Sequence, residues 1–181
     1  MSELRTNRII PRDGLPSGAS GGGIIQVVQN VVTSAIVASS AGPTFVTVMS
    51  GSITPTSASN KILVMVDATV GSSNGYGTKL NVYRSGTQIY RGDAAGSRPR
   101  VSKAITNYPG AATTYMSNPV NVIFLDSPGV SGSSITYDVK LSSYSTVFWT
   151  FNRSYADQED TANGAYDGRT ASSITLMEVT A

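Results

Sequence analysis

The chain has 181 residues, of which 40% are hydrophobic and 13% charged, and its formal net charge is +2. This length supports one domain with a core of its own, and the small net charge argues against a nucleic-acid partner, which needs a broad basic surface. The chain contains no cysteine and no histidine, which excludes thiol nucleophiles, disulfides, Cys or His zinc sites and histidine-based catalytic triads.

An extended arm is predicted for residues 1–23. Pro11 and Pro16 prevent a continuous helix there, and the Gly/Ser run 18–23 is typical of a flexible linker. The arm has apolar residues but no core in which to bury them, so neighbouring copies of the chain are expected to cover them. These residues are Leu4, Ile9, Ile10 and Leu15.

No stretch of the sequence reaches the roughly 20 apolar residues that span a bilayer, so membrane insertion is not expected. The segment 24–41 follows several arginines, as the apolar part of a signal peptide would. However, Gln26, Gln29 and Asn30 interrupt it, and the leader would be unusually long. We therefore expect a protein that is made in the cytoplasm and not exported.

From Ile24 onward, short runs rich in β-branched residues alternate with Gly, Pro, Ser and Asn, and no amphipathic helix of useful length interrupts them. Many short strands at regular spacing are typical of a β-sandwich or barrel. The predicted strands cover residues 24–32, 44–50, 61–70, 79–84, 88–91, 101–106, 113–116, 120–125, 135–141, 147–152 and 173–179.

Three regions of this sequence also predict a turn or the burial of particular strand faces. Ser85-Gly86 between two runs predicts a tight hairpin, because glycine accepts a positive φ. The run 135–141 alternates apolar and polar residues, which predicts one buried and one exposed face. The run 62–66 (ILVMV) is apolar on both faces, so it is expected to be covered either by two layers of its own fold or by a neighbouring subunit.

Together these patterns predict an all-β knob domain over residues 24–181, folded as an antiparallel two-sheet jelly-roll sandwich. The apolar strands near both ends of this domain are expected to lie close to the axis of a homo-oligomer. We assign the subunit interface to Ile24, Ile25, Leu63, Met65 and Leu176.

Acidic residues gather in one loop near the end of the chain: Asp157, Glu159, Asp160 and Asp167. Carboxylates in a loop can bind calcium, but this spacing does not match the D-x-D-x-D-G pattern. A hydrolase of the paired-carboxylate type would need two acids that converge across a cleft. We therefore predict no metal site, no cofactor and no catalytic residues, and calcium binding by this loop is the alternative.

Two further groups are candidates for ligand binding. The basic residues Arg84, Arg91, Arg98, Arg100 and Lys103 suit an anionic glycan or phosphate, unless they bridge subunits or pair with Asp93 and Asp126. The aromatic stretch 144–155 suits sugar stacking, unless its rings pack in the core or at a subunit interface. The candidate receptor or glycan-binding residues are Arg98, Arg100, Trp149, Tyr155 and Tyr166.

Several segments carry a family likeness. They are SELRTNRIIPRDGLPSGASGGGIIQVVQ (2–29), ITPTSASNKILVMV (53–66), GDAAGSR (92–98), FLDSPG (124–129) and SSITLMEV (172–179). In these segments the chain resembles a module of tailed-phage virion proteins, especially those of cyanophages, which occurs in tail fibres and in capsid decoration proteins.

This resemblance implies a homotrimeric jelly-roll knob of the C1q and tumour-necrosis-factor type on the virion surface, without enzymatic activity. As a short tail fibre, spike or receptor-binding tip, which we favour, the knob would contact a host-surface glycan through loops far from the arm. As a capsid cement protein, it would attach to another virion protein through Arg5, Arg8, Ile9, Ile10 and Arg12. Outside virion proteins, the alternatives are a carbohydrate-binding module and, after it, a glycan-degrading enzyme.

Overall fold

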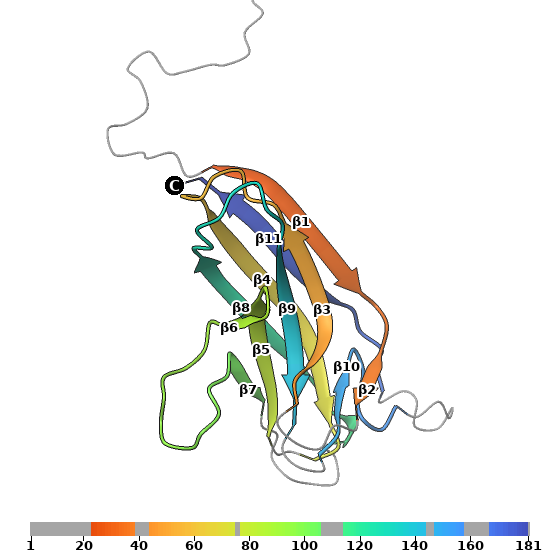
Figure 1. Ribbon diagram of the computed structural model, residues 1–181. Helices are drawn as coiled ribbons and strands as arrows, with labels where there is room; N and C mark the ends of the chain where they lie inside the picture. The colour runs from red at the N-terminus through yellow and green to blue at the C-terminus, as the bar shows by residue number, and fades with distance from the viewer. Residues whose placement is uncertain are drawn as a thin grey trace, which may run out of the picture.

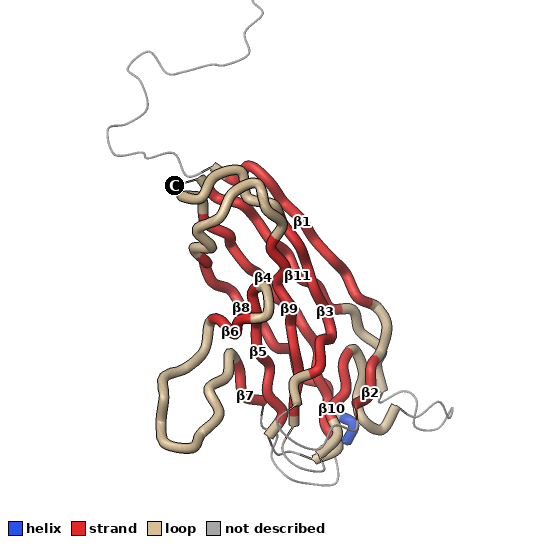
Figure 2. Tube along the Cα trace, viewed as in Figure 1, coloured by secondary structure: helices blue, strands red, loops and turns tan. Residues whose placement is uncertain are grey.

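The computed structural model describes residues 23–38, 44–74, 77–105, 114–143, 147–157 and 167–180. In this part the chain is all-β, and its strands form two antiparallel sheets, of six and five strands, packed into a jelly-roll-like sandwich (Figure 1). The described residues contain no α-helix, only a single 3-10 turn at 114–115 (Figure 2). The predicted fold class is confirmed.

The strand bounds match most of the expected runs. The strands are β1 (Ile24–Val32), β2 (Ile36–Ala38), β3 (Val46–Ile53), β4 (Lys61–Ser72), β5 (Thr78–Arg84), β6 (Thr87–Ile89), β7 (Lys103–Ile105), β8 (Ser117–Asp126), β9 (Ile135–Ser142), β10 (Trp149–Phe151) and β11 (Ser172–Val179).

Sheet A is built around β4, the longest strand. β8 pairs with one edge of β4 over nearly its full length, while β11 and then β10 follow one another along the other edge. β1 pairs with β11, and β2 pairs with β10. One half of sheet A therefore has the order β1-β11-β4-β8, and the other half has the order β2-β10-β4-β8.

Sheet B has the order β3-β9-β5, with β6 and β7 sharing the free edge of β5. The β5–β6 hairpin turns at Ser85 (φ 45°) and Gly86 (φ 84°), as the Ser-Gly pair predicted. Two consecutive positive φ values give the tight turn whose twist matches antiparallel strands. Along the chain β3, β4 and β5 alternate between the two sheets, as do β8, β9 and β11, so most paired strands other than β5 and β6 are distant in sequence.

The core lies between the sheets and takes alternate residues from each strand. On β9, Ile135, Tyr137, Val139 and Leu141 are buried, as the alternation predicted. On β4, Ile62, Val64 and Val66 are buried in the same way, whereas Leu63 and Met65 point to the outer face of sheet A. The described part of the chain gives that outer face only partial cover.

Two strand predictions differ from the structure. The strand predicted at 113–116 is wrong, because residues 114–115 form the 3-10 turn and Met116 lies outside any strand. β2 was not predicted, since three residues within a longer apolar run give no period of their own. An extended arm was predicted for residues 1–23. Residues 1–22 lie outside the described residues, and only Gly23 of the predicted arm is described.

Both ends of the described chain meet at one end of the sandwich (Figure 1). The Gly23 N–H donates to Thr180 Oγ1 (2.8 Å), and the Thr180 N–H donates to the Gly23 carbonyl (3.0 Å). The described chain therefore begins beside the C-terminal strand. No helix in the described ranges is both long enough and apolar enough to cross a membrane.

A buried carboxylate organises the same end. Glu178 on β11 is fully buried, and its Oε1 accepts hydrogen bonds from Thr56 N (2.7 Å), Thr56 Oγ1 (2.8 Å) and Asn60 Nδ2 (2.6 Å). Burial alone would raise the pKa of Glu178, but the hydrogen bonds from Asn60 and Thr56 outweigh it and lower the pKa below the ordinary 4.5. The ionised side chain thus fastens the loop between β3 and β4 to β11.

Candidate functional site

Two rows of side chains cross the outer face of sheet A, and each row takes one residue from β1, β11, β4 and β8 in turn. The first row is Val27, Met177, Leu63 and Leu125. The second row is Gln29, Thr175, Met65 and Ile123. Side chains opposite one another on neighbouring strands lie about 5 Å apart on the same face. The apolar members therefore form a continuous surface, which we call the apolar strip: Val27, Leu63, Met65, Ile123, Leu125 and Met177.

The apolar strip is accessible to solvent. Val27, Ile123 and Leu125 are 57%, 58% and 49% exposed, and the other three side chains are half-buried. Exposed apolar residues scattered singly are normal on a protein surface, whereas a contiguous apolar patch marks a contact surface. Each square ångström of apolar surface removed from water contributes about 25 cal/mol. Covering the strip would therefore stabilise an assembly.

The apolar strip has a polar boundary. Lys61 and Asp67 are exposed on the same face of β4, beyond Leu63 at one end and beyond Met65 at the other. Next to Met65 and Ile123 the surface forms a shallow hollow of about 340 Å³, whose other lining residues are mainly polar. These polar residues are Gln29, Asp67, Asn121, Ser173 and Thr175. An uncharged apolar centre with a polar rim is the usual anatomy of a protein–protein interface.

Four of the five predicted interface residues lie on the surface. Leu63 and Met65 belong to the apolar strip, and Ile24 and Ile25 are exposed at the start of β1. The assignment of Leu176 to the interface is wrong, because on β11 the even-numbered residues point inward and Leu176 is fully buried in the core. It therefore cannot contact another subunit.

The sequence interpretation missed four members of the strip, which are Val27, Ile123, Leu125 and Met177. A signal for two of them is present in the sequence. The run 120–125 (VNVIFL) is apolar on both faces over its second half, as 62–66 is, and the same reasoning applied to it would have placed Ile123 and Leu125 on a covered outer face.

The aromatic candidates occupy different environments. Trp149 on β10 is fully buried in the core, so the prediction that it stacks on a receptor sugar is wrong. Its strand lies between β2 and β4, and its side chain points into the sandwich. Tyr155 is half-buried, with its ring 5.8 Å from that of Phe148. Tyr166 lies outside the described residues.

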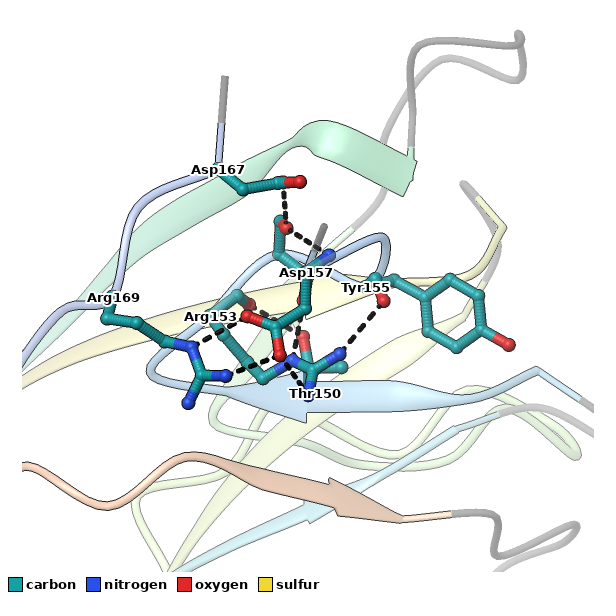
Figure 3. Close-up of polar contacts among 7 residues, drawn as sticks. Thr150, Arg153, Tyr155, Asp157, Asp167 and Arg169 are labelled. Carbon is teal, nitrogen blue, oxygen red and sulfur yellow. Dashed lines mark hydrogen bonds and ion pairs between the residues drawn. The ribbon is translucent and has the colours of Figure 1, made fainter. Parts of the chain in front are cut away.

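Asp157, at one end of the acidic loop, sits between two arginines (Figure 3). Its Oδ2 lies 2.6 Å from Arg153 Nη1 and 2.5 Å from Arg169 Nη2, and its Oδ1 accepts from Arg169 Nε (2.6 Å). Asp167, at the other end, accepts a hydrogen bond from Ser154 Oγ. These contacts tie residues 153–157 to residues 167–169, so they hold the two ends of the loop together.

This arrangement does not favour calcium. Both oxygens of Asp157 already bind guanidinium groups, which repel a cation. In the described residues no three acidic, Cys or His side chains converge, and Glu159 and Asp160 lie outside these residues. The described ends of the loop therefore act as a structural clasp.

The basic cluster divides into an internal and an external part. Arg84 Nη1 lies 2.8 Å and 2.7 Å from the two oxygens of Asp126, and Tyr137 Oη donates to Asp126 Oδ2 (2.7 Å). The pKa of Tyr137 is raised, mainly because the side chain is buried and also because of the hydrogen bond to Asp126 and the negative charge of Asp126. Arg84 is thus engaged by Asp126 within the fold and has a structural role. Arg91, Arg98, Arg100 and Lys103 form no ion pair with any described carboxylate and are exposed.

No protein-family model matches the chain, and no curated protein matches it at a significant level of sequence similarity.

Proposed function

We propose that the chain is a non-enzymatic structural protein of a tailed-phage particle, which assembles as a homotrimer through the outer face of sheet A and forms a surface knob as a short fibre or spike. The observation that carries this proposal is the apolar strip, which spans β1, β11, β4 and β8 and remains open to solvent in one copy of the chain.

A second and third copy of the chain suit the strip better than a charged partner would. The strip itself contains no charged residue, and the chain as a whole is poor in charge. An apolar surface of another copy can pack against the strip without burying an unpaired charge. Burial of an unpaired charge would cost several kcal/mol. Most soluble oligomers are symmetric assemblies of identical chains.

The resemblance to phage virion modules supports the same surface. The segments that carry it include five of the six strip residues: Val27 in 2–29, Leu63 and Met65 in 53–66, Leu125 in 124–129 and Met177 in 172–179. Segment 53–66 also contains Thr56 and Asn60, which Glu178 holds in place. The likeness therefore covers most of the proposed interface and the end of the knob at which the described chain begins.

Two features support a non-enzymatic role. The chain has neither cysteine nor histidine. In addition, the described carboxylates that lie close to other charged groups, Asp126 and Asp157, are paired with arginines and not with each other. Neither pair provides the free acid and base that a hydrolase needs.

The mass of the purified chain in solution tests the assembly. Multi-angle light scattering should give three times the mass of one chain, and Ile123→Asp should give a single copy with an unchanged circular dichroism spectrum, because it places a charge in the apolar strip. Thr47→Asp, on an exposed position of β3 in sheet B, is the matched control and should remain trimeric. A monomeric wild-type chain would refute the proposal. Binding of the trimer to phage capsids and not to host cells would refute its placement on a fibre.

A further inference from the structure

Positive charge is concentrated in the segment that connects β6 to β7 and includes Lys103, the first residue of β7. Residues 90–103 contain four basic residues and one acidic residue, so this segment has a net charge of +3 while the whole chain has +2. The rest of the chain is therefore slightly negative. The segment projects from the side of the sandwich next to β7 (Figure 1), so its charge is presented away from the body of the knob.

The basic side chains of this segment are available for a ligand. Arg91, Arg98 and Lys103 are exposed, and none of their side chains forms a hydrogen bond or ion pair with a residue that the structure describes. Arg100 differs, because its Nε donates to the Gly92 carbonyl (2.6 Å). Arg100 as a residue is nevertheless exposed.

The backbone of the segment is fixed at its base. Gly92 N donates to the Val101 carbonyl (3.2 Å), and Gln88 Nε2 donates to the Arg100 carbonyl (2.7 Å). Ser102 N lies within hydrogen-bond distance of both Asn81 Oδ1 (3.0 Å) and the Leu80 carbonyl (3.1 Å) of β5. A loop that is already ordered loses less conformational entropy when it binds a ligand.

An aromatic contact closes the base on the other side. The ring of Tyr90 stacks on that of Phe124 of β8, with centroids 4.4 Å apart and an interplanar angle of 13°. Tyr90 is the only aromatic residue in 90–103, and one face of its ring is thus occupied. The segment therefore presents its cations with one partly covered ring, and not with the series of rings on which successive nucleobases stack.

The tip of the segment forms a turn with an open, shallow hollow beside it. Arg98 N donates to the Ala95 carbonyl (3.2 Å), and Gly96 has a φ of 56°, which glycine adopts without strain. Ala95, Gly96, Ser97 and Arg98 line the resulting hollow. Because the other lining side chains are small, the guanidinium of Arg98 can reach a ligand in the hollow, and its planar fork matches carboxylate, sulfate and phosphate groups.

We propose that the segment 90–103 is a binding site for an anionic polysaccharide of the host surface, with Arg91, Arg98 and Lys103 as its contacts and Arg100 as a positioning residue. This site rests on the proposed function, since a surface knob with three such loops binds a repeating polymer with higher avidity than one loop does. It takes the place of the buried Trp149 as the receptor-binding feature.

Heparin, a sulfated and carboxylated polysaccharide, is the probe, and neutral dextran of similar length is its reference. Heparin should bind and dextran should not, and added salt should weaken heparin binding by screening. Arg98→Gln should lower heparin affinity about threefold, and combining it with Arg91→Gln and Lys103→Gln should lower it at least about tenfold. Lys140→Gln removes the same unit charge from β9, which is separated from β7 by β5, and should change the affinity less than twofold, because the ammonium group of Lys140 is engaged by the Tyr83 ring.

Three results would overturn the site: no heparin binding, an equal loss in Arg98→Gln and Lys140→Gln, or equal affinity for single-stranded DNA of the same charge. The mass of each sample, measured in parallel, separates this inference from the proposed assembly. A trimer that does not bind heparin would refute the binding site but not the assembly. A monomer that binds heparin through Arg98 would refute the trimer and support the binding site.

Discussion

Leu63 of β4 and Leu125 of β8 lie directly opposite each other on the outer face of sheet A, where neither contributes to the core of its own chain. We expect Leu63→Ala and Leu125→Ala each to weaken assembly about tenfold, because truncation of an apolar residue at the centre of an interface costs about 1–2 kcal/mol. The folded monomer should keep its stability. Dissociation on dilution, followed by light scattering, measures the effect.

A control and a double variant sharpen this test. Val37 on β2 is also exposed, at 48%, but lies outside the two rows, so Val37→Ala should leave the dissociation constant unchanged. Since Leu63 and Leu125 are neighbours, their double variant should lose less than the sum of the single losses. Equal effects of all three single substitutions would count against the strip as the interface.

Trp149 provides a prediction about stability and not about binding. Trp149→Ala should lower the free energy of unfolding by about 3–5 kcal/mol, because it leaves a large cavity between the sheets. Urea denaturation followed by circular dichroism measures this loss. Tyr155→Ala removes a half-buried ring of the same region and should cost clearly less. A Trp149→Ala protein as stable as wild type would contradict the buried position.

Sequence patterns within one strand or one turn predicted those features of the fold that depend only on residues close together in the chain. The turn at Ser85-Gly86 and the buried face of 135–141 follow from glycine's positive φ and from strict alternation. The sequence could not predict which side of β11 is buried, because two adjacent residues, Leu176 and Met177, are both apolar. Only the pairing of β11 with β4, more than 100 residues away in the chain, decides which of the two side chains points into the core.

The same limit applies to the candidate site. Residues on β1, β4, β8 and β11 make up the apolar strip, so the surface exists only after four distant segments pair in register. A charged residue such as Glu178 is normally expected at the surface. Its burial depends on donors from Thr56 and Asn60, which the sequence places about 120 residues earlier.

Gly71 marks a close approach of two strands within sheet A. A Cβ atom at this position would contact Thr150 Oγ1 and would lie 2.7 Å from the Arg153 carbonyl oxygen. Gly71→Ala should therefore push β10 away from β4 and lower the free energy of unfolding by about 1–3 kcal/mol. Gly168→Ala, where a Cβ meets nothing within 4 Å, should be neutral. Similar urea midpoints for the two variants would contradict this packing.

The ionised Glu178 predicts a specific response to pH. Because its pKa is lower in the folded state, its contribution to stability is complete above about pH 4.5 and is lost as the pH falls through the folded-state pKa. The difference in unfolding free energy between wild type and Glu178→Gln should therefore favour wild type at about pH 7 and narrow at about pH 3. Asp93→Asn, at an exposed carboxylate without a partner in the described residues, should follow wild type at both values. A difference between wild type and Glu178→Gln that stays constant with pH would mean that the carboxylate charge does not hold the loop at Thr56 and Asn60.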